Sequence, residues 1–193
     1  MTSPPKLTYT ALLTHLDAQV ASILPNQILD TSHPDHGGFV GAAEGTPSSS
    51  HIGAVQTLGY AWLSKGSYYH DNPKILERIL LAASFFRSIR RPSGRFDLIT
   101  TNWDCGPMTA FLIEAIASVV SATRDSALEG SDDIAVEWGE IIQSAVPGMV
   151  SGGFHTPNHR WVLTSALSQA LRLFPDLDAL SEIESYLAET VDI

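Results

Sequence analysis

Apolar residues recur at helical spacing along most of this chain, and this periodicity limits the fold more than any other feature. Leu12, Leu16, Val20 and Ile23 mark one such stripe, and spacings of three or four residues place side chains on one face of a helix. A half-buried strand would need apolar and polar residues in alternation, and only the short segment FDLIT, residues 96–100, offers a candidate. The pattern therefore predicts an all-α protein.

Seven helices follow from the periodicity and from its breaks at Pro and Gly. Asn72 and Pro73 mark the clearest start, because Asn caps a first turn and Pro is tolerated at the first helical position. Pro147 and Gly148 are expected to end the fifth helix. The expected helices cover residues 7–24, 51–64, 73–89, 107–120, 132–145, 157–173 and 176–190.

The connections between these helices differ in length and composition. The segment DTSHPDHGGFVGAAEGTPSSS, residues 30–50, is long and rich in Gly, Pro and Ser, and long loops are usually functional or disordered. Alternate connections are long and polar, whereas the others are brief. This asymmetry predicts stacked helical hairpins with their working loops at one end. The natural architecture is an α/α toroid, incomplete at this length, with a helical bundle or solenoid as the alternative.

Composition excludes several classes of partner. The 193 residues carry a formal net charge of −10, which argues against nucleic acid and anionic membrane surfaces, because both attract basic patches. The chain contains no run of about 18 apolar residues, so the sequence predicts no membrane span. The N-terminus lacks the basic and apolar regions of a signal peptide, so a cytoplasmic location is the default expectation. A single cysteine, Cys105, excludes an internal disulfide framework.

Three loop segments hold most of the chemically active side chains. They are HPDHGGF at residues 33–39, with His51 at the end of the same loop, RFDLITTNWDCGP at 95–107, and SGGFHTPNHRW at 151–161. Some of the histidines have spacings that resemble zinc ligands, but no cysteine partner or HExxH motif accompanies them. No GxSxG elbow and no phosphate-binding glycine motif is present. We therefore expect neither a metal nor a cofactor.

The third segment combines a helix start with a high density of hydrogen-bonding side chains. A helix that begins here places His159 near the positive end of the helix dipole, which favours bound anions. Asn158, His159 and Arg160 together could bind a carboxylate. Trp103 and Trp161 are suited to stack against a sugar ring. The alternative is a core position for Trp161 and a solvated Arg160.

Taken in order, three segments resemble the heparinase II/III-like proteins: GGF, then YYHDNPKILERILLAASFFRSIRRPSGRFDLITTNWDCGPMTAF, then TPNHRWVLTSALSQALRLFPD. The similarity extends from about Asp35 to Asp192, and its most specific pieces are DLITTNW and TPNHRW. It implies a polysaccharide lyase or a relative of one, with an N-terminal α/α toroid followed by a β-sandwich. Such lyases cleave a uronic acid-containing chain by β-elimination.

The resemblance also implies roles for particular residues. A base removes the proton α to the sugar carboxylate, which must be neutralised so that the enolate is stabilised. Asn158 and His159 are the expected neutraliser and base, and Asn102 is a further carboxylate contact. No tyrosine lies within a matching motif. Substrate-binding roles are expected for Trp103, Arg160, His155, His51, Trp161 and Asp104.

Two features depart from the family pattern. The chain ends at AETVDI where the family continues into more toroid and a β-sandwich, and NWDCGPMTAF replaces a more open polar run. We therefore expect residues 1–193 to form one helical domain that is part of a larger toroid. We also expect a truncated or inactive relative whose exposed helix faces promote self-association.

The sequence leaves three functional hypotheses. The first is a lyase that acts on an acidic polysaccharide or oligosaccharide. The second is a non-catalytic carbohydrate-binding or interaction fragment. The third is an α/α-toroid glycoside hydrolase with Asp97 and Asp104 as acid and base, although a structural role is the simpler interpretation. In that interpretation Asp97 caps a turn and Asp104 caps the following helix.

Overall fold

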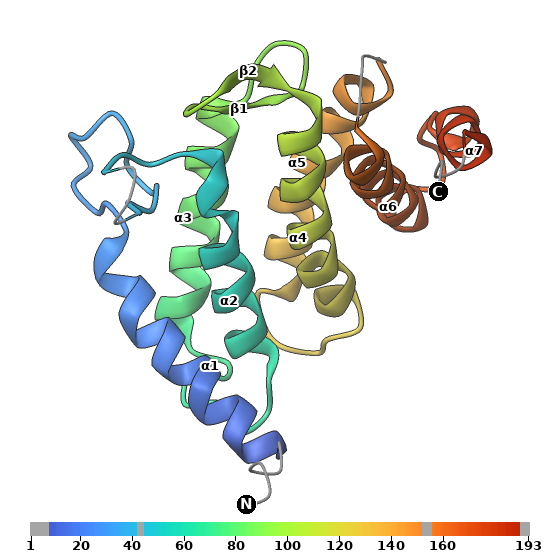
Figure 1. The fold of residues 1–193 in the computed structure, drawn as a ribbon. Coiled ribbons are helices and arrows are strands. Elements are labelled where there is room, and N and C mark those ends of the chain that lie inside the picture. Colours follow the sequence, from blue (N-terminus) through green and yellow to red (C-terminus); the bar gives the residue numbers. More distant parts are fainter. Residues whose placement is uncertain (1–7, 42–44, 152–155, 190–193) are drawn as a thin grey trace, which may run out of the picture.

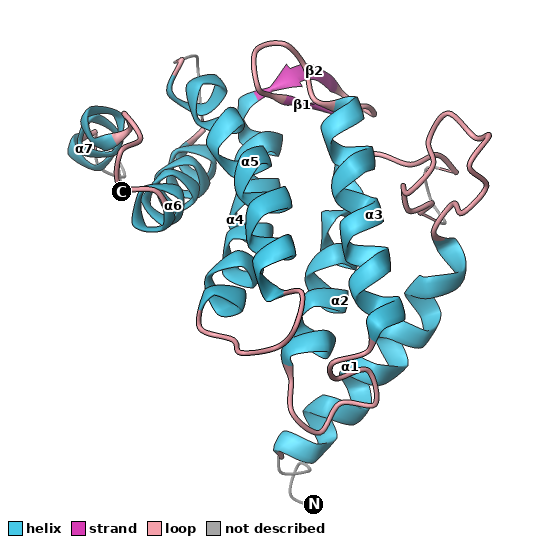
Figure 2. Ribbon diagram, turned by 180° about the vertical axis from the view of Figure 1, so that it is seen from behind, coloured by secondary structure: helices cyan, strands magenta, loops and turns pink. Residues whose placement is uncertain are grey.

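Helices dominate the structure, as the periodicity predicts (Figure 1; Figure 2). The computed structural model describes residues 8–41, 45–151 and 156–189, and the all-α prediction is confirmed for this part of the chain. Its helices are α1 (Tyr9–Ile23), α2 (Ile52–Leu63), α3 (Pro73–Ile89), α4 (Gly106–Arg124), α5 (Ser131–Val150), α6 (Pro157–Leu173) and α7 (Leu180–Ala188). Two short 3₁₀ turns, η1 (Leu24–Asn26) and η2 (Ser49–His51), precede α2.

The helices alternate in direction and form two layers. Helices α2, α4 and α6 run the same way, and α4 packs between the other two (Figure 1). Helices α3 and α5 run the opposite way and pack side by side in the second layer (Figure 2). Consecutive helices pair as the hairpins α2–α3, α4–α5 and α6–α7, while α1 adds to α2. The stacked hairpins expected from the sequence are therefore present.

Helix α4 is the centre of the hydrophobic core. It packs against α2, α5 and α6, and Leu112, Ile113, Ile116 and Val120 are fully buried. Among the described helices it is the one that is long and apolar enough to cross a membrane by length and composition. Buried core helices can also be this long and apolar. Because 61% of the most apolar window of α4 is buried inside the fold, we interpret α4 as a core helix.

A short antiparallel hairpin closes one end of the two layers. Its strands are β1 (Phe96–Leu98) and β2 (Asn102–Cys105), with Leu98 opposite Asn102 and Phe96 opposite Cys105. The FDLIT segment therefore does contain a strand, whose partner follows it immediately. We call this end the loop end. It comprises residues 24–41, 45–51 and 90–105, the last turn of α5 and the first turn of α6, whereas residues 64–72 and 125–130 lie at the opposite end (Figure 1).

Three helix boundaries differ from the prediction by four residues or more. Helix α4 ends at Arg124 instead of residue 120. Helix α5 continues through Pro147 to Val150, because Val146 and Met149 are buried in the core and this packing outweighs the one backbone hydrogen bond that proline removes. Helix α7 begins at Leu180 rather than Asp176. The start of α3 is as predicted: Pro73 is the first helical residue, and the Asn72 side chain accepts a hydrogen bond from the N–H of Lys74 at 2.9 Å.

Candidate functional site

Asp97 organises the hairpin at the loop end. Its two carboxylate oxygens accept hydrogen bonds from Nε of Arg91 at 3.0 and 2.9 Å, and Oδ1 accepts the backbone N–H of Asp104 at 2.6 Å. Burial of the side chain raises its pKa, but the hydrogen bonds from Arg91 and Asp104 and the charge of Arg91 outweigh burial, so the net pKa lies below the ordinary value. Asp97 is therefore an ionised structural anchor.

Trp103 is exposed on the hairpin and contacts Arg91, the partner of Asp97. Its side chain is 65% exposed, and the guanidinium carbon of Arg91 lies 5.4 Å from the ring centroid. Asn102 precedes it at the start of β2 and is also exposed. The same arginine thus binds Asp97 and the indole, which fixes the ring at the surface of the hairpin.

Asp104 does not cap the following helix, so that part of the structural interpretation is wrong. The N-cap of α4 is Cys105, whose Sγ accepts the N–H of Met108 at 3.4 Å. Asp104 adopts a left-handed backbone conformation with φ of 49°, and its carboxylate accepts a hydrogen bond from Ser93 Oγ and lies 3.9 Å from Nη1 of Arg95. The side chain therefore faces residues 93–95, which precede β1.

Arg95 attaches the hairpin to the end of α5. Its Nε donates to the carbonyl of Gly148 at 2.6 Å, and its Nη2 donates to Ser151 Oγ. A Cβ on Gly148 would lie 2.7 Å from Cγ of Arg95 and 2.8 Å from the carbonyl oxygen of Ser93. Glycine is therefore required at this contact, which places the second loop segment beside the end of α5.

The turn η2, which ends at His51, joins the first loop segment to the hairpin. Nδ1 of His51 accepts the backbone N–H of Ser48 at 3.2 Å in a capping box, and the neighbouring Ser49 Oγ donates to the Asp97 carbonyl at 2.6 Å. His51 also lines a pocket of about 270 Å³ together with Asn26 and Phe39. Within the described residues, no group of three or more His, Cys, Asp or Glu side chains is placed to hold a metal ion.

The start of α6 differs in detail from the expectation. Thr156 is the N-cap, but its hydroxyl donates to Oδ1 of Asn158 at 2.6 Å instead of accepting a backbone N–H. Arg160 is ion-paired with Glu189, just after α7, so the interpretation of Arg160 as a solvated side chain is wrong. Asn158 is exposed and His159 is half-buried, whereas His155 lies outside the described residues.

Trp161 is not a core residue, because its side chain is 54% exposed. It belongs to an exposed face of the first layer, and three hydrogen bonds connect the helices of that face. Tyr60 OH and Ser118 Oγ are 2.7 Å apart, Gln56 Nε2 donates to the Ala115 carbonyl at 3.2 Å, and Ser165 Oγ donates to Oε1 of Glu114 at 2.7 Å. We call this surface the α2/α4/α6 face and define it by Gln56, Tyr60, Phe111, Glu114, Ser118, Trp161 and Ser165.

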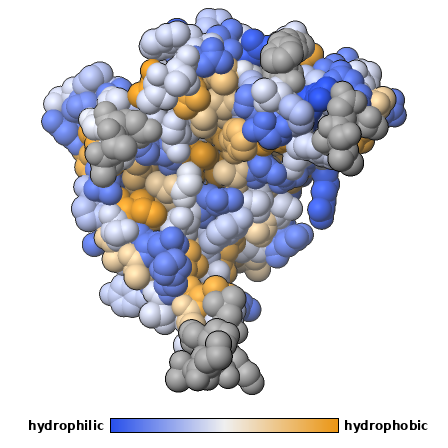
Figure 3. Space-filling view, in the orientation of Figure 1, coloured by the Kyte–Doolittle hydropathy of each residue, from blue (hydrophilic) through white to orange (hydrophobic). Residues whose placement is uncertain are grey.

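The α2/α4/α6 face has little charge for a helical surface. Tyr60, Phe111 and Trp161 are 39%, 46% and 54% exposed, and Glu114 is the only charged member of the set. Helix α2 has no charged residue at all. Apolar surface occupies the upper centre of this side of the molecule (Figure 3). Exposed rings among hydroxyl and amide groups are suited to sugars, which present apolar ring faces and many hydroxyls.

Sequence reasoning missed these face residues apart from Trp161. Their spacing is that of any solvent-facing helix stripe, so periodicity alone gives no signal. The signal available was the scarcity of charge in α2 and α4, since an exposed helix surface normally carries Lys and Glu.

Tyr186 is a second residue that the sequence does not single out. It lies on α7, and its pKa is raised to about 12 by burial and by the charges and hydrogen bonding of Glu182, with a smaller effect from Glu189. Its phenol is therefore protonated at neutral pH and can donate a hydrogen bond but cannot act as a base. The charge of Arg95 has a smaller effect in the opposite direction.

Comparison with known proteins gives no relative for this chain: no family model matches it, and neither curated proteins nor solved structures produce a match.

Proposed function

We propose that the protein binds a uronic acid-containing polysaccharide at its loop end and cleaves it by β-elimination, as a lyase of the heparinase II/III-like type. The observation that carries the proposal is the α2/α4/α6 face. Its exposed rings and uncharged polar groups begin at Trp161, beside Asn158 and His159, and continue along three parallel helices. Such a surface suits a sugar chain better than it suits a nucleic acid, which would require basic residues.

We further propose that the two layers are part of an α/α toroid. In a toroid, each hairpin adds one helix to an inner layer and one antiparallel helix to an outer layer. Helices α2, α4 and α6 follow the first pattern, and α3 and α5 follow the second. The loops that would carry the chemistry then lie at one end of the inner layer, where Trp103 and the start of α6 are found (Figure 1).

In the proposed reaction the His159 imidazole takes the proton α to the uronate carboxylate. The amide groups of Asn102 and Asn158 donate hydrogen bonds to that carboxylate and stabilise the negative charge that develops on it. The Asn158 amide nitrogen is suited to this role because its carbonyl oxygen already accepts Thr156. The bond from the β-carbon to the leaving sugar oxygen then breaks as a carbon–carbon double bond forms. The leaving oxygen takes a proton from water, and His159 returns the abstracted proton to the solvent.

A panel of uronate polymers tests this reaction, read as ultraviolet absorbance of the unsaturated product. At least one polymer is expected to give product. The His159→Ala variant is expected to lose activity about 100-fold or more, as for removal of a general base. His15→Ala is the matched control, because His15 is exposed on α1 and lies outside the loop end. Absence of product from every polymer contradicts the lyase proposal.

Non-catalytic carbohydrate binding is the second candidate, and the pairing of the arginines favours it. Arg91, Arg95 and Arg160 all interact with carboxylates of the protein itself, so fewer cations are available to neutralise a substrate. This candidate predicts sugar binding that survives His159→Ala and Asn158→Ala, with no turnover at any pH. The hydrolase is less well supported, because a general acid needs a raised pKa and the pKa of Asp97 is lowered.

A further inference from the structure

The second layer contains an open groove that has no part in the proposed sugar site. It lies between α3 and α5 and has a volume of about 670 Å³. Its lining extends from Pro73 to Ser84 on α3, a length of roughly 17 Å at 1.5 Å per residue. These dimensions match about three turns of a partner helix.

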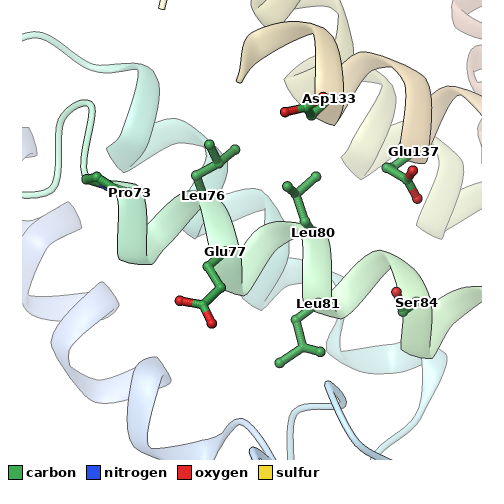
Figure 4. A pocket seen from close by; sticks show the side chains of 8 residues that line it. All are labelled: Pro73, Leu76, Glu77, Leu80, Leu81, Ser84, Asp133 and Glu137. Carbon is green, nitrogen blue, oxygen red and sulfur yellow. The ribbon is translucent and has the colours of Figure 1, made fainter. Parts of the chain in front are cut away.

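The groove has an apolar floor. Leu76 and Leu80 are one helical turn apart, are only partly buried, and pack against the core. Figure 4 shows both side chains directed from α3 toward α5. A partner helix with apolar residues at positions i and i+4 could cover both leucines, and partners that bind in helical grooves commonly use this spacing.

The rims of the groove are acidic. Glu77 on α3 and Asp133 on α5 are exposed, and neither has an ion-pair partner in the described part of the chain. Glu137 also lines the groove, and Arg87 pairs with it and lies 3.4 Å from Glu140 (Figure 4). Arg87 therefore neutralises part of the negative charge at the Glu137 end of the groove. The end with Glu77 and Asp133 keeps its negative charge. The net charge of −10 strengthens that field.

We propose that this groove binds a short basic amphipathic helix of a partner protein. The leucines would accept the apolar stripe of the partner, and Glu77 and Asp133 would pair with lysines or arginines beside that stripe. Charge complementarity argues for a basic partner over a second copy of this acidic chain. The inference is independent of the proposed lyase function.

The test uses the full chain and a labelled synthetic peptide of about 12 residues, or roughly three turns, with leucines at helical spacing and lysines elsewhere. Fluorescence anisotropy is expected to show saturable binding. The Glu77→Lys/Asp133→Lys double variant is expected to weaken the affinity about tenfold, or 1.4 kcal/mol. The control is Asp176→Lys/Glu184→Lys, which changes the net charge equally at exposed positions and should have less than about a twofold effect.

Two further measurements separate specific docking from general attraction. Ser84→Cys supplies an exposed thiol for an environment-sensitive dye, because Cys105 is buried, and the peptide should shift its emission. A dye at Ser168→Cys on α6 should not respond. Equal weakening by both double variants, equal binding of a peptide with Glu in place of Lys, or no binding at all would overturn the proposal. Sedimentation showing that this groove joins two copies of the chain would also overturn it.

Discussion

At Asp97 a single carboxylate connects the two strands of the hairpin. It binds Arg91 before β1 and the backbone of Asp104 in β2, and Arg91 in turn contacts the Trp103 ring. The sequence offered Asp97 either as a catalytic acid or as a structural cap. The lowered pKa and the bound guanidinium favour the structural role, and they make the position of Trp103 depend on this ion pair.

The Asp97→Asn variant is expected to lose about 1–2 kcal/mol of unfolding free energy at pH 7, since a partly buried hydrogen bond to a charged group is lost. The pKa of Asp97 is lowered from 3.8, so its ionised form stabilises the fold above pH 4, and this stability is lost as the pH falls through the folded-state pKa. The difference between wild type and variant should therefore shrink below pH 4. Urea unfolding measures this difference in unfolding free energy, with Asp176→Asn at an exposed position as the control. An unchanged unfolding midpoint for Asp97→Asn would contradict the structural role of Asp97.

Residue roles were predictable where the neighbours in sequence decide them. Asn72 caps α3 as expected because its hydrogen bond goes to Lys74, two residues away. Arg160 and Trp161 were not predictable in this way. The first depends on Glu189, 29 residues later, and the second on how α6 packs against α4. Long-range contacts of this kind leave no local pattern.

At the scale of elements, the contact between the β1–β2 hairpin and α5 holds the loop end together. Gly94 has φ of +88°, and a Cβ there would collide with the carbonyl oxygen of Ser144. A Cβ on Gly148 would lie 2.7 Å from Cγ of Arg95 and 2.8 Å from the carbonyl oxygen of Ser93. The prediction that Pro147 and Gly148 end the helix rested on their propensities alone. Packing reversed that outcome, because the last turn of α5 supports the hairpin.

Gly148→Ala is expected to destabilise the protein by about 1–3 kcal/mol, because the added methyl group overpacks the contact with Arg95 and Ser93. Gly53→Ala is the matched control: it is also within a helix, but a Cβ there meets nothing within 4 Å. Alanine should be neutral or stabilise by up to about 1 kcal/mol at that position. Thermal unfolding of both variants checks the pair, and equal effects would contradict the proposed close contact.

At the scale of the whole molecule, the sequence predicted seven helices, their hairpin pairing and a common loop end. These features follow from apolar periodicity and from loop lengths, which are local properties. The α2/α4/α6 face could not be predicted, because it requires knowing that stripes of α2, α4 and α6 are neighbours. The same holds for the groove between α3 and α5. Surfaces shared by helices distant in sequence emerge only when the hairpins stack.

The central claim is that the loop end and the adjoining α2/α4/α6 face form a binding site for an acidic glycan. Hydrogen exchange of the full protein, with and without a saturating oligosaccharide of the uronate polymer that gives the strongest signal, tests it most directly. We predict added protection in residues 93–105 and in the first turns of α6, and none in α3. Unchanged exchange at the loop end, or protection confined to α3 and α5, would contradict the claim.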